Sequence, residues 1–182
     1  MGWAIILNAP DDLFNSYPPA TFQANKLAMS YCGKQDMQRL FDEMKTMKIK
    51  KDDLAEAIHC YKNGYYKSCA LILFGLIDAK LIRKQSKGSG KRRKTGATAM
   101  KIIKEKVEQE TNINKTLFYL LDFLTLTSCI YTLFADGNDF TDEPVTINRN
   151  FVNHGMSTKR VRKRDCVQLF LVLYNLVSCL DY

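Results

Sequence analysis

Apolar side chains recur every three or four positions along most of the chain, which is the spacing of one face of an α-helix. The clearest run is Met37, Leu40, Phe41, Met44 and Met47. The pattern predicts helices over residues 20–32, 35–48, from Asp52 to the Asn63-Gly64 break, 65–84, 97–109, 114–135 and 164–180. Alternation of apolar and polar residues, typical of a half-buried strand, is nowhere sustained. We therefore predict an all-α fold, a compact bundle of five to seven helices with short loops.

The size and composition predict one soluble domain. The chain has 182 residues, of which 46% are apolar and 25% charged, as in ordinary globular proteins. We expect a single domain over residues 1–182, in which residues 1–45 add N-terminal helices. The longest apolar stretches are far shorter than the roughly 20 residues that cross a bilayer, and no basic residue precedes the apolar run from Trp3 to Leu7. These features predict a cytoplasmic protein without a membrane partner.

The last predicted helix, over residues 164–180, is apolar on nearly all sides. Its apolar residues exceed one face: Val167, Phe170, Leu171, Leu173, Tyr174 and Val177. Such a helix needs cover on more than one side. We expect part of that cover to come from a second subunit, and hence a homodimer.

The cysteines and histidines give no sign of a metal or a cofactor. None of the six cysteines forms a CxxC pair, and most lie in apolar helical stretches, which is typical of reduced structural thiols in a cytoplasm. The chain has only two histidines, and His59 has no ligand partner at metal spacing. The Gly88-Ser89-Gly90-Lys91 stretch lacks the first glycine and the final Ser or Thr of a phosphate loop. We expect neither metal nor cofactor.

Positive charge is confined to two short segments. The net charge is +8, but seven cations lie between Arg83 and Lys94 and five more between Lys159 and Arg164, so the rest of the chain carries −4. Such clusters favour a polyanion, with nucleic acid as the first candidate and an anionic membrane surface as the second. A solvated loop that only aids solubility is the alternative. The residues expected to contact RNA are Lys91, Arg92, Arg93, Lys159, Arg160 and Arg162.

Residues 147–156 join an acidic loop to the second basic cluster and concentrate four functional side chains within six positions: Arg149, Asn150, Asn153 and His154. In an ideal helix Asn150 and His154 share a face, whereas Arg149 and His154 lie roughly 140° apart. The latter two converge on one ligand only if the turn departs from an ideal helix, or if two copies of the segment meet at a dimer axis. Taken alone, the segment also fits a helix-capping turn with a satisfied histidine.

The sequence from Arg149 to His154 resembles the Arg-x4-His motif of the HEPN domain superfamily, with the favoured polar residue, Asn150, after the arginine. The surrounding residues resemble the abortive-infection branch of that superfamily. The resemblance covers about residues 50–180, including the Tyr61 to Ala70 stretch and the apolar closing helix. It does not cover residues 1–45.

The resemblance implies a metal-independent endoribonuclease that acts as a homodimer, with one cleft formed by the motifs of two subunits. It further implies an antitoxin or a defence-system protein as a partner. His154 would transfer protons during attack of the RNA 2′-hydroxyl, because imidazole exchanges protons near neutrality. Arg149 would stabilise phosphate charge, and Asn150 would bind a phosphate oxygen or orient His154.

Two further side chains are expected to orient the motif. The first is Asn153, within it. The second is Asp78, which lies in the helix that the resemblance places beside the motif. A buried carboxylate requires a cation, and Arg149 is the candidate, with Lys80 or solvent as alternatives. Two other functions stay open at this point: a non-catalytic HEPN-like module that binds RNA or a nucleotide, and a helical interaction protein.

Overall fold

The computed structural model describes residues 21–85, 92–109 and 117–181 of the chain. These residues contain no strand and form eight α-helices and one short 3-10 turn. The elements are α2 (Thr21–Ser30), α3 (Lys34–Thr46), α4 (Lys51–Lys62), α5 (Tyr66–Lys84), α6 (Gly96–Gln109), α7 (Leu117–Leu133), η1 (Asn138–Phe140), α8 (Arg149–Asn153) and α9 (Lys163–Leu180). The all-α prediction is confirmed. The described residues contain one helix more than the seven predicted at most, and the additional helix is α8, the short turn over residues 149–153.

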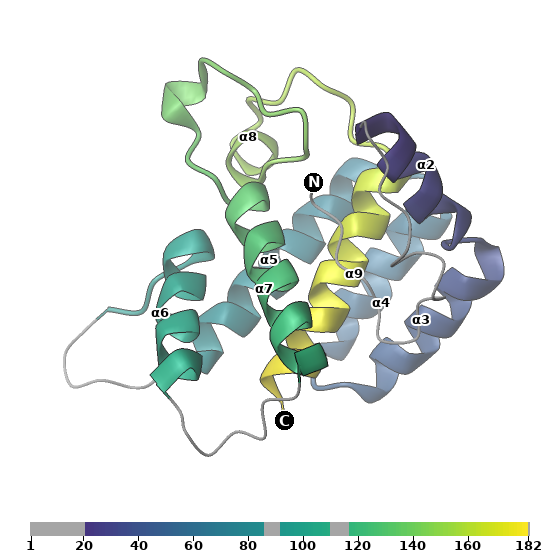
Figure 1. Cartoon of the computed structure of the whole chain (residues 1–182). Helices are drawn as coiled ribbons and strands as arrows, with labels where there is room; N and C mark the ends of the chain where they lie inside the picture. Colours follow the sequence, from purple (N-terminus) through teal and green to yellow (C-terminus); the bar gives the residue numbers. More distant parts are fainter. Residues whose placement is uncertain (1–20, 86–91, 110–116, 182) are drawn as a thin grey trace.

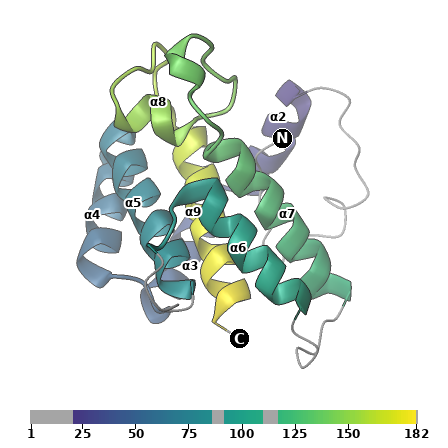
Figure 2. The same cartoon turned by 90° about the vertical axis from the view of Figure 1, so that its left-hand side faces the viewer.

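Helices α5 and α9 form the centre of the bundle (Figure 1). Helix α4 packs on α5 and is covered by α3, whereas α7 packs on α9 and α6 bridges α5 and α7. Helix α8 lies at the end of the bundle where α9 begins, and the chain finishes at the opposite end (Figure 2). The site residues of the 147–156 segment therefore lie at one end of the bundle.

The apolar faces of these helices meet in one continuous core that reaches from Met37 to Leu180. Helix α9 is its axis: Phe170 and Val172 are fully buried, and Tyr174 alone among the apolar residues of this helix is half-buried. The cover that the sequence led us to expect from a second subunit is therefore supplied within the chain, by α5 and α7 and, at Phe170, by Phe41 of α3 and Tyr61 of α4. Helix α9 gives no reason to expect a dimer.

Helix α7, in contrast to α9, exposes several apolar side chains along one side. They recur at three-, four- and seven-residue intervals: Leu120, Leu121, Leu124 and Tyr131. None of the helices in the described ranges is both long enough and apolar enough to cross a bilayer.

The turn between α4 and α5 follows from the Asn63-Gly64 pair. Gly64 has a φ of +79°, which glycine adopts without steric cost. Its N–H donates to the Tyr61 carbonyl at 3.3 Å, and the Tyr65 N–H donates to the Cys60 carbonyl at 2.8 Å. These two bonds form a Schellman motif, which satisfies the last carbonyls of α4. The reversal leaves the Tyr65 side chain 61% exposed at the start of α5.

All six cysteines are free, and five of them are buried, as the sequence predicted. Burial raises the pKa of Cys129 to about 11 and that of Cys179 to about 12. Thiols with such values stay protonated and serve as small apolar core residues.

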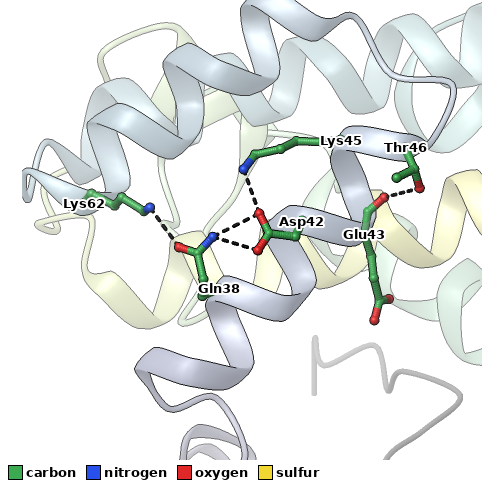
Figure 3. A network of polar contacts seen from close by, with 6 residues as sticks. All are labelled: Gln38, Asp42, Glu43, Lys45, Thr46 and Lys62. Carbon is green, nitrogen blue, oxygen red and sulfur yellow. Dashed lines mark hydrogen bonds and ion pairs between the residues drawn. The ribbon is translucent and has the colours of Figure 1, made fainter.

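A polar network joins the outer faces of α3 and α4 (Figure 3). Gln38 donates to both oxygens of Asp42 at 3.0 Å, and Lys45 donates to Asp42 at 2.7 Å. Lys62 of α4 reaches across to the Gln38 amide oxygen at 2.9 Å. Both hydrogen bonds lower the pKa of Asp42, and the one from Gln38 has the larger effect. Because these groups are solvated, the network contributes little to the stability of the fold. It lies on α3 and α4, apart from residues 147–156.

Candidate functional site

Helix α8 is short because the sequence caps it at both ends. Asn148 precedes it with extended backbone angles, and its side-chain oxygen accepts from the Asn150 N–H at 2.8 Å and the Phe151 N–H at 3.3 Å. At the other end Gly155 has a φ of +71°, and the Met156 N–H donates to the Phe151 carbonyl at 2.9 Å. This is a second Schellman motif, so α8 cannot continue beyond His154.

Two asparagines attach α8 to the end of α7. The side-chain amides of Asn148 and Asn150 each donate to the Ala135 carbonyl at 3.0 Å. Ala135 follows the last turn of α7, where carbonyls lack partners within the helix. Asn148 is only 2% exposed, so this attachment is shielded from water.

Arg149, the first residue of α8, is held by a carboxylate from α5. Its Nη2 lies 3.3 Å from Asp78 Oδ2, and the other oxygen of Asp78 accepts from the Gly96 N–H at 2.9 Å. The side chain of Asp78 is 13% exposed and that of Arg149 28%. The pairing of Asp78 with Arg149 is confirmed. Asp78 thereby joins α8 to the start of α6 as well.

Lys80, the alternative partner of Asp78, pairs instead with Asp181 near the C-terminal end of α5. Its ammonium lies 2.5 Å from an oxygen of Asp181, whose other oxygen lies 2.9 Å from Lys84. Desolvation lowers the pKa of Lys80, and its hydrogen bond with Asp181 opposes that shift. Desolvation raises the pKa of Asp181, but the hydrogen bonds from the two lysines outweigh it and leave the pKa lowered. These charges fix the C-terminal end of α9 to α5.

His154 lies at the exposed end of α8. Its ring meets the Phe140 ring edge-on, with centroids 5.6 Å apart, and Phe140 also packs on Phe151 at 5.3 Å. Phe140 reaches this position through a turn in which Asn138, Asp139 and Phe140 all have positive φ, between 43° and 59°. Asn and Asp tolerate this conformation better than most residues. The acidic loop that precedes residue 147, over residues 137–144, therefore places an aromatic ring against His154.

The structure thus separates Arg149 from His154. Arg149 points to α5, His154 to η1, and no hydrogen bond joins them among the described residues. Asn150 accepts from Arg149 Nη1 at 3.1 Å, so it orients the arginine instead of His154. Asn153 is exposed. The interpretation as a capping turn is half confirmed, since α8 is capped, but the His154 ring forms no hydrogen bond within the described ranges.

The second basic cluster follows α8 and is tied to the acidic loop by Glu143. The Glu143 carboxylate accepts from the Ser157 hydroxyl at 2.5 Å and from the Thr158 hydroxyl at 2.6 Å. Lys159 donates to the Glu143 carbonyl at 2.9 Å. Desolvation raises the pKa of Glu143, but the hydrogen bonds from Ser157 and Thr158 outweigh it and leave the pKa lowered. Arg160 and Arg162 are exposed beside this anchored segment.

The first basic cluster is described only in part. Arg92 is exposed and Arg93 is partly buried, just before α6. Lys91 lies outside the described residues. The segment is fixed by Gln85, whose amide nitrogen donates to the Lys94 carbonyl at 2.7 Å and whose oxygen accepts from the Lys94 N–H at 2.8 Å.

Two hollows flank the segment from Ser157 to Val161. One, of about 320 Å³, lies between this segment and the start of α5 and is lined by Tyr65, Lys67, Lys159 and Arg160 among others. The second, of about 270 Å³, lies toward the acidic loop and includes the carboxylates of Glu143 and Asp165. Among the residues that the structure describes, no group of three or more histidine, cysteine, aspartate or glutamate side chains is placed to hold a metal ion.

Three contributors to the site were not identified from the sequence. Asn148 carried a usable signal, since an asparagine before a short helical turn that ends in Gly155 is a typical N-cap. Gly96 and Phe140 carried none, because their roles depend on which helices meet. Comparison of the chain with models of protein families, with curated proteins and with solved structures finds no match.

Proposed function

We propose that the chain is a metal-independent endoribonuclease of the HEPN kind that acts on RNA in the cytoplasm. The observation that carries the proposal is the fixed position of Arg149, which Asp78 and Asn150 hold at the start of a five-residue helix whose C-cap is the exposed His154. An arginine fork matches phosphate geometry, and an accessible imidazole can take up and release protons.

In the proposed reaction the RNA cuts itself through its own 2′-hydroxyl. His154 takes the hydroxyl proton or returns one to the departing 5′-oxygen, and Arg149 stabilises the charge that develops on the phosphorus oxygens. The products are a 2′,3′-cyclic phosphate and a free 5′-hydroxyl. Asn150 acts through Arg149 as a positioning residue.

The separation of Arg149 from His154 within one chain favours a cleft made by two copies. At a two-fold axis the arginine of one copy can face the histidine of the other. The homodimer is therefore part of the proposal, although its support comes from the two ends of α8 and from the resemblance and not from α9. A cognate antitoxin or defence protein would regulate such an enzyme.

Incubation of the purified full chain with a mixed RNA pool in EDTA tests the reaction. We expect cleavage that leaves cyclic phosphate ends. His154→Ala should reduce the rate by about 10²–10⁴-fold, as expected for loss of a general acid or base. Arg149→Ala should weaken both cutting and binding, and Asn150→Ala should reduce the rate less than either. Activity that survives His154→Ala, or that EDTA abolishes, contradicts the proposal.

Mixing two inactive variants tests the shared cleft. Equal amounts of Arg149→Ala and His154→Ala chains, dissociated and reassembled together, should recover about a quarter of the wild-type rate, because half of the dimers are mixed and each keeps one complete pair. If the arginine and the histidine of the same chain cooperate, mixing recovers nothing. Light scattering that shows a monomer at micromolar concentration would also exclude the shared cleft.

A non-catalytic RNA-binding module is the second candidate. It is favoured by the contacts of Arg149, whose guanidinium is already neutralised by Asp78 in the single chain. Under this alternative the wild-type chain binds the RNA pool but leaves it uncut, and His154→Ala changes nothing.

A further inference from the structure

The larger hollow, between the start of α5 and the segment from Ser157 to Val161, has the chemistry of a nucleotide-binding subsite. Three cations line it, Lys67, Lys159 and Arg160, and no carboxylate does. The neighbouring hollow also has four basic lining residues, but Glu143 and Asp165 line it with them. An anion in the first hollow therefore meets no lining carboxylate, whereas an anion in the second hollow does.

Two of these cations have no competing partner among the residues that the structure describes. Lys159 donates to the carbonyls of Glu143 and Pro144, whereas the side chains of Lys67 and Arg160 form no hydrogen bond or ion pair with the described part of the chain. A guanidinium and an ammonium that face one hollow and are otherwise solvated can both bind a phosphate.

An aromatic ring lines the same hollow. Tyr65 is 61% exposed, because the Schellman motif at Gly64 turns it away from the core. The adjacent Tyr66 ring packs instead on Tyr61, with centroids 6.2 Å apart. An exposed ring next to cations is a platform on which a nucleic-acid base can stack. The volume, about 320 Å³, is at the lower limit of small-ligand sites and suits one nucleotide.

The hollow adjoins the proposed site. Val152, two residues before His154, and Ser157, three residues after it, both line the hollow. On α5, Ser68 lines the hollow, and Asp78, the partner of Arg149, lies ten residues further along, which corresponds to about 15 Å of helix. Helix α8 therefore lies against α5 with Arg149 at Asp78 and its His154 end toward the hollow.

We propose that this hollow binds one nucleotide of a single-stranded RNA, with Arg160 and Lys67 on its phosphate and Tyr65 stacked on its base. The inference rests on the proposed function for the identity of the polymer. It adds two residues, Tyr65 and Lys67, that the charge clusters alone do not indicate.

Fluorescence anisotropy with short labelled RNA, on the His154→Ala full chain to prevent cutting, tests the subsite. Tyr65→Leu should weaken single-strand binding by about tenfold, and Tyr65→Phe should restore it, because stacking needs the ring and not the hydroxyl. Binding of a blunt RNA duplex should not respond to Tyr65→Leu, since paired bases are not free to stack.

The phosphate contacts have a separate readout. The double variant Lys67→Gln/Arg160→Gln should lower the slope of log affinity against log salt by about 0.7, because the two side chains share one phosphate and each neutralised single-strand phosphate contributes about 0.7. The matched control, Lys34→Gln/Lys101→Gln, removes two exposed lysines from α3 and α6 and should leave the slope unchanged. Phe22→Leu is the matched control for an exposed ring, on α2.

Several results would overturn the subsite: an unchanged affinity in Tyr65→Leu, an equal loss in the control variants, or no RNA binding at all. If the variants of the hollow lose binding to phosphatidylserine vesicles but keep their affinity for RNA, the surface binds a membrane and not RNA. The proposed function is tested independently. If Tyr65 governs binding but the wild type never cuts RNA, the subsite stands and the nuclease fails. If the wild type cuts and Tyr65→Leu has no effect, the reverse holds.

Discussion

Replacement of Asp78 by asparagine tests whether the carboxylate holds α8 in place. The two oxygens of Asp78 serve different donors, the Gly96 N–H at 2.9 Å and Arg149 Nη2 at 3.3 Å. Asparagine keeps the size of the side chain but offers one oxygen and one NH₂ group. If its oxygen accepts from Gly96, its amide hydrogens face the hydrogens of Arg149. The substitution therefore removes a charge and sets two donors against each other.

The magnitude follows from the exposure of the pair. A hydrogen bond to a charged group contributes about 1.5–3 kcal/mol. Because the Arg149 side chain is 28% exposed, water compensates part of the loss, and we expect Asp78→Asn to lower the free energy of unfolding by about 1–2 kcal/mol. Asp78→Ala leaves both donors without an acceptor, so its effect should be larger, about 2–3 kcal/mol.

Urea unfolding followed by circular dichroism measures these changes, provided that the slope against urea is the same for each variant. A double-mutant cycle with Arg149→Met, which keeps the length of the side chain, isolates the pair. We expect a coupling energy of about 1 kcal/mol. Asp53→Asn is the matched control, since it breaks the exposed ion pair with Lys50 and should change stability by less than about 0.5 kcal/mol.

Two results would refute the reasoning. If Asp78→Asn and Arg149→Met are additive, the ion pair does not contribute in solution. If Asp53→Asn is as destabilising as Asp78→Asn, burial is not the reason for the effect.

Three further substitutions are expected to change the stability of the bundle. Gly75→Ala should raise the free energy of unfolding in urea by about 0.5–1 kcal/mol, because a Cβ there meets no atom within 4 Å and alanine favours the helix. Gly96→Ala should lower it by about 2 kcal/mol or more, since φ is +54° and the new Cβ would lie 2.8 Å from Phe134; a loss below about 0.5 kcal/mol would contradict this. Glu143 has a lowered pKa, so its contribution is complete above its unfolded value near 4.5 and is lost as the pH falls through the lower folded value. Glu143→Gln should therefore flatten the acid branch of the urea midpoint against pH, and an unchanged branch would show that its hydrogen bonds are not formed.

The helices were predictable because their pattern is local. The three- and four-residue spacing placed α3, α5, α6 and α9 within two residues of their ends, and Asn63-Gly64 marked the turn between α4 and α5. The same pattern cannot say what covers an apolar helix. Residues such as Phe170 indicated that α9 is buried, but not that helices of the same chain bury it.

The candidate site was predictable only where a residue is unusual for its own surroundings. Asp78 is such a residue, a carboxylate within an apolar helix, and its need for a cation led to Arg149 once the resemblance had placed its helix beside the motif. The role of Asn150 was not accessible in this way. It depends on a hydrogen bond to the Ala135 carbonyl at the end of α7. Every residue has a backbone carbonyl, and only the packing of the helices places this one beside Asn150. The contact between Phe140 and His154 likewise requires a left-handed turn that no glycine signals.

The two ends of α8 differ in how firmly the chain holds them, and this difference bears on how a substrate can approach. At the Arg149 end, Asp78 and the two asparagine contacts with Ala135 fix the backbone and the side chain. At the His154 end, Gly155 closes the helix, and the imidazole packs on Phe140 without a hydrogen bond to the described residues. An arginine that is positioned in advance stabilises charge without reorganisation, whereas a group that transfers protons must keep its nitrogens accessible. In the proposed complex, RNA in the hollow beside Tyr65 would therefore approach the His154 end of α8, since Val152 and Ser157 line that hollow.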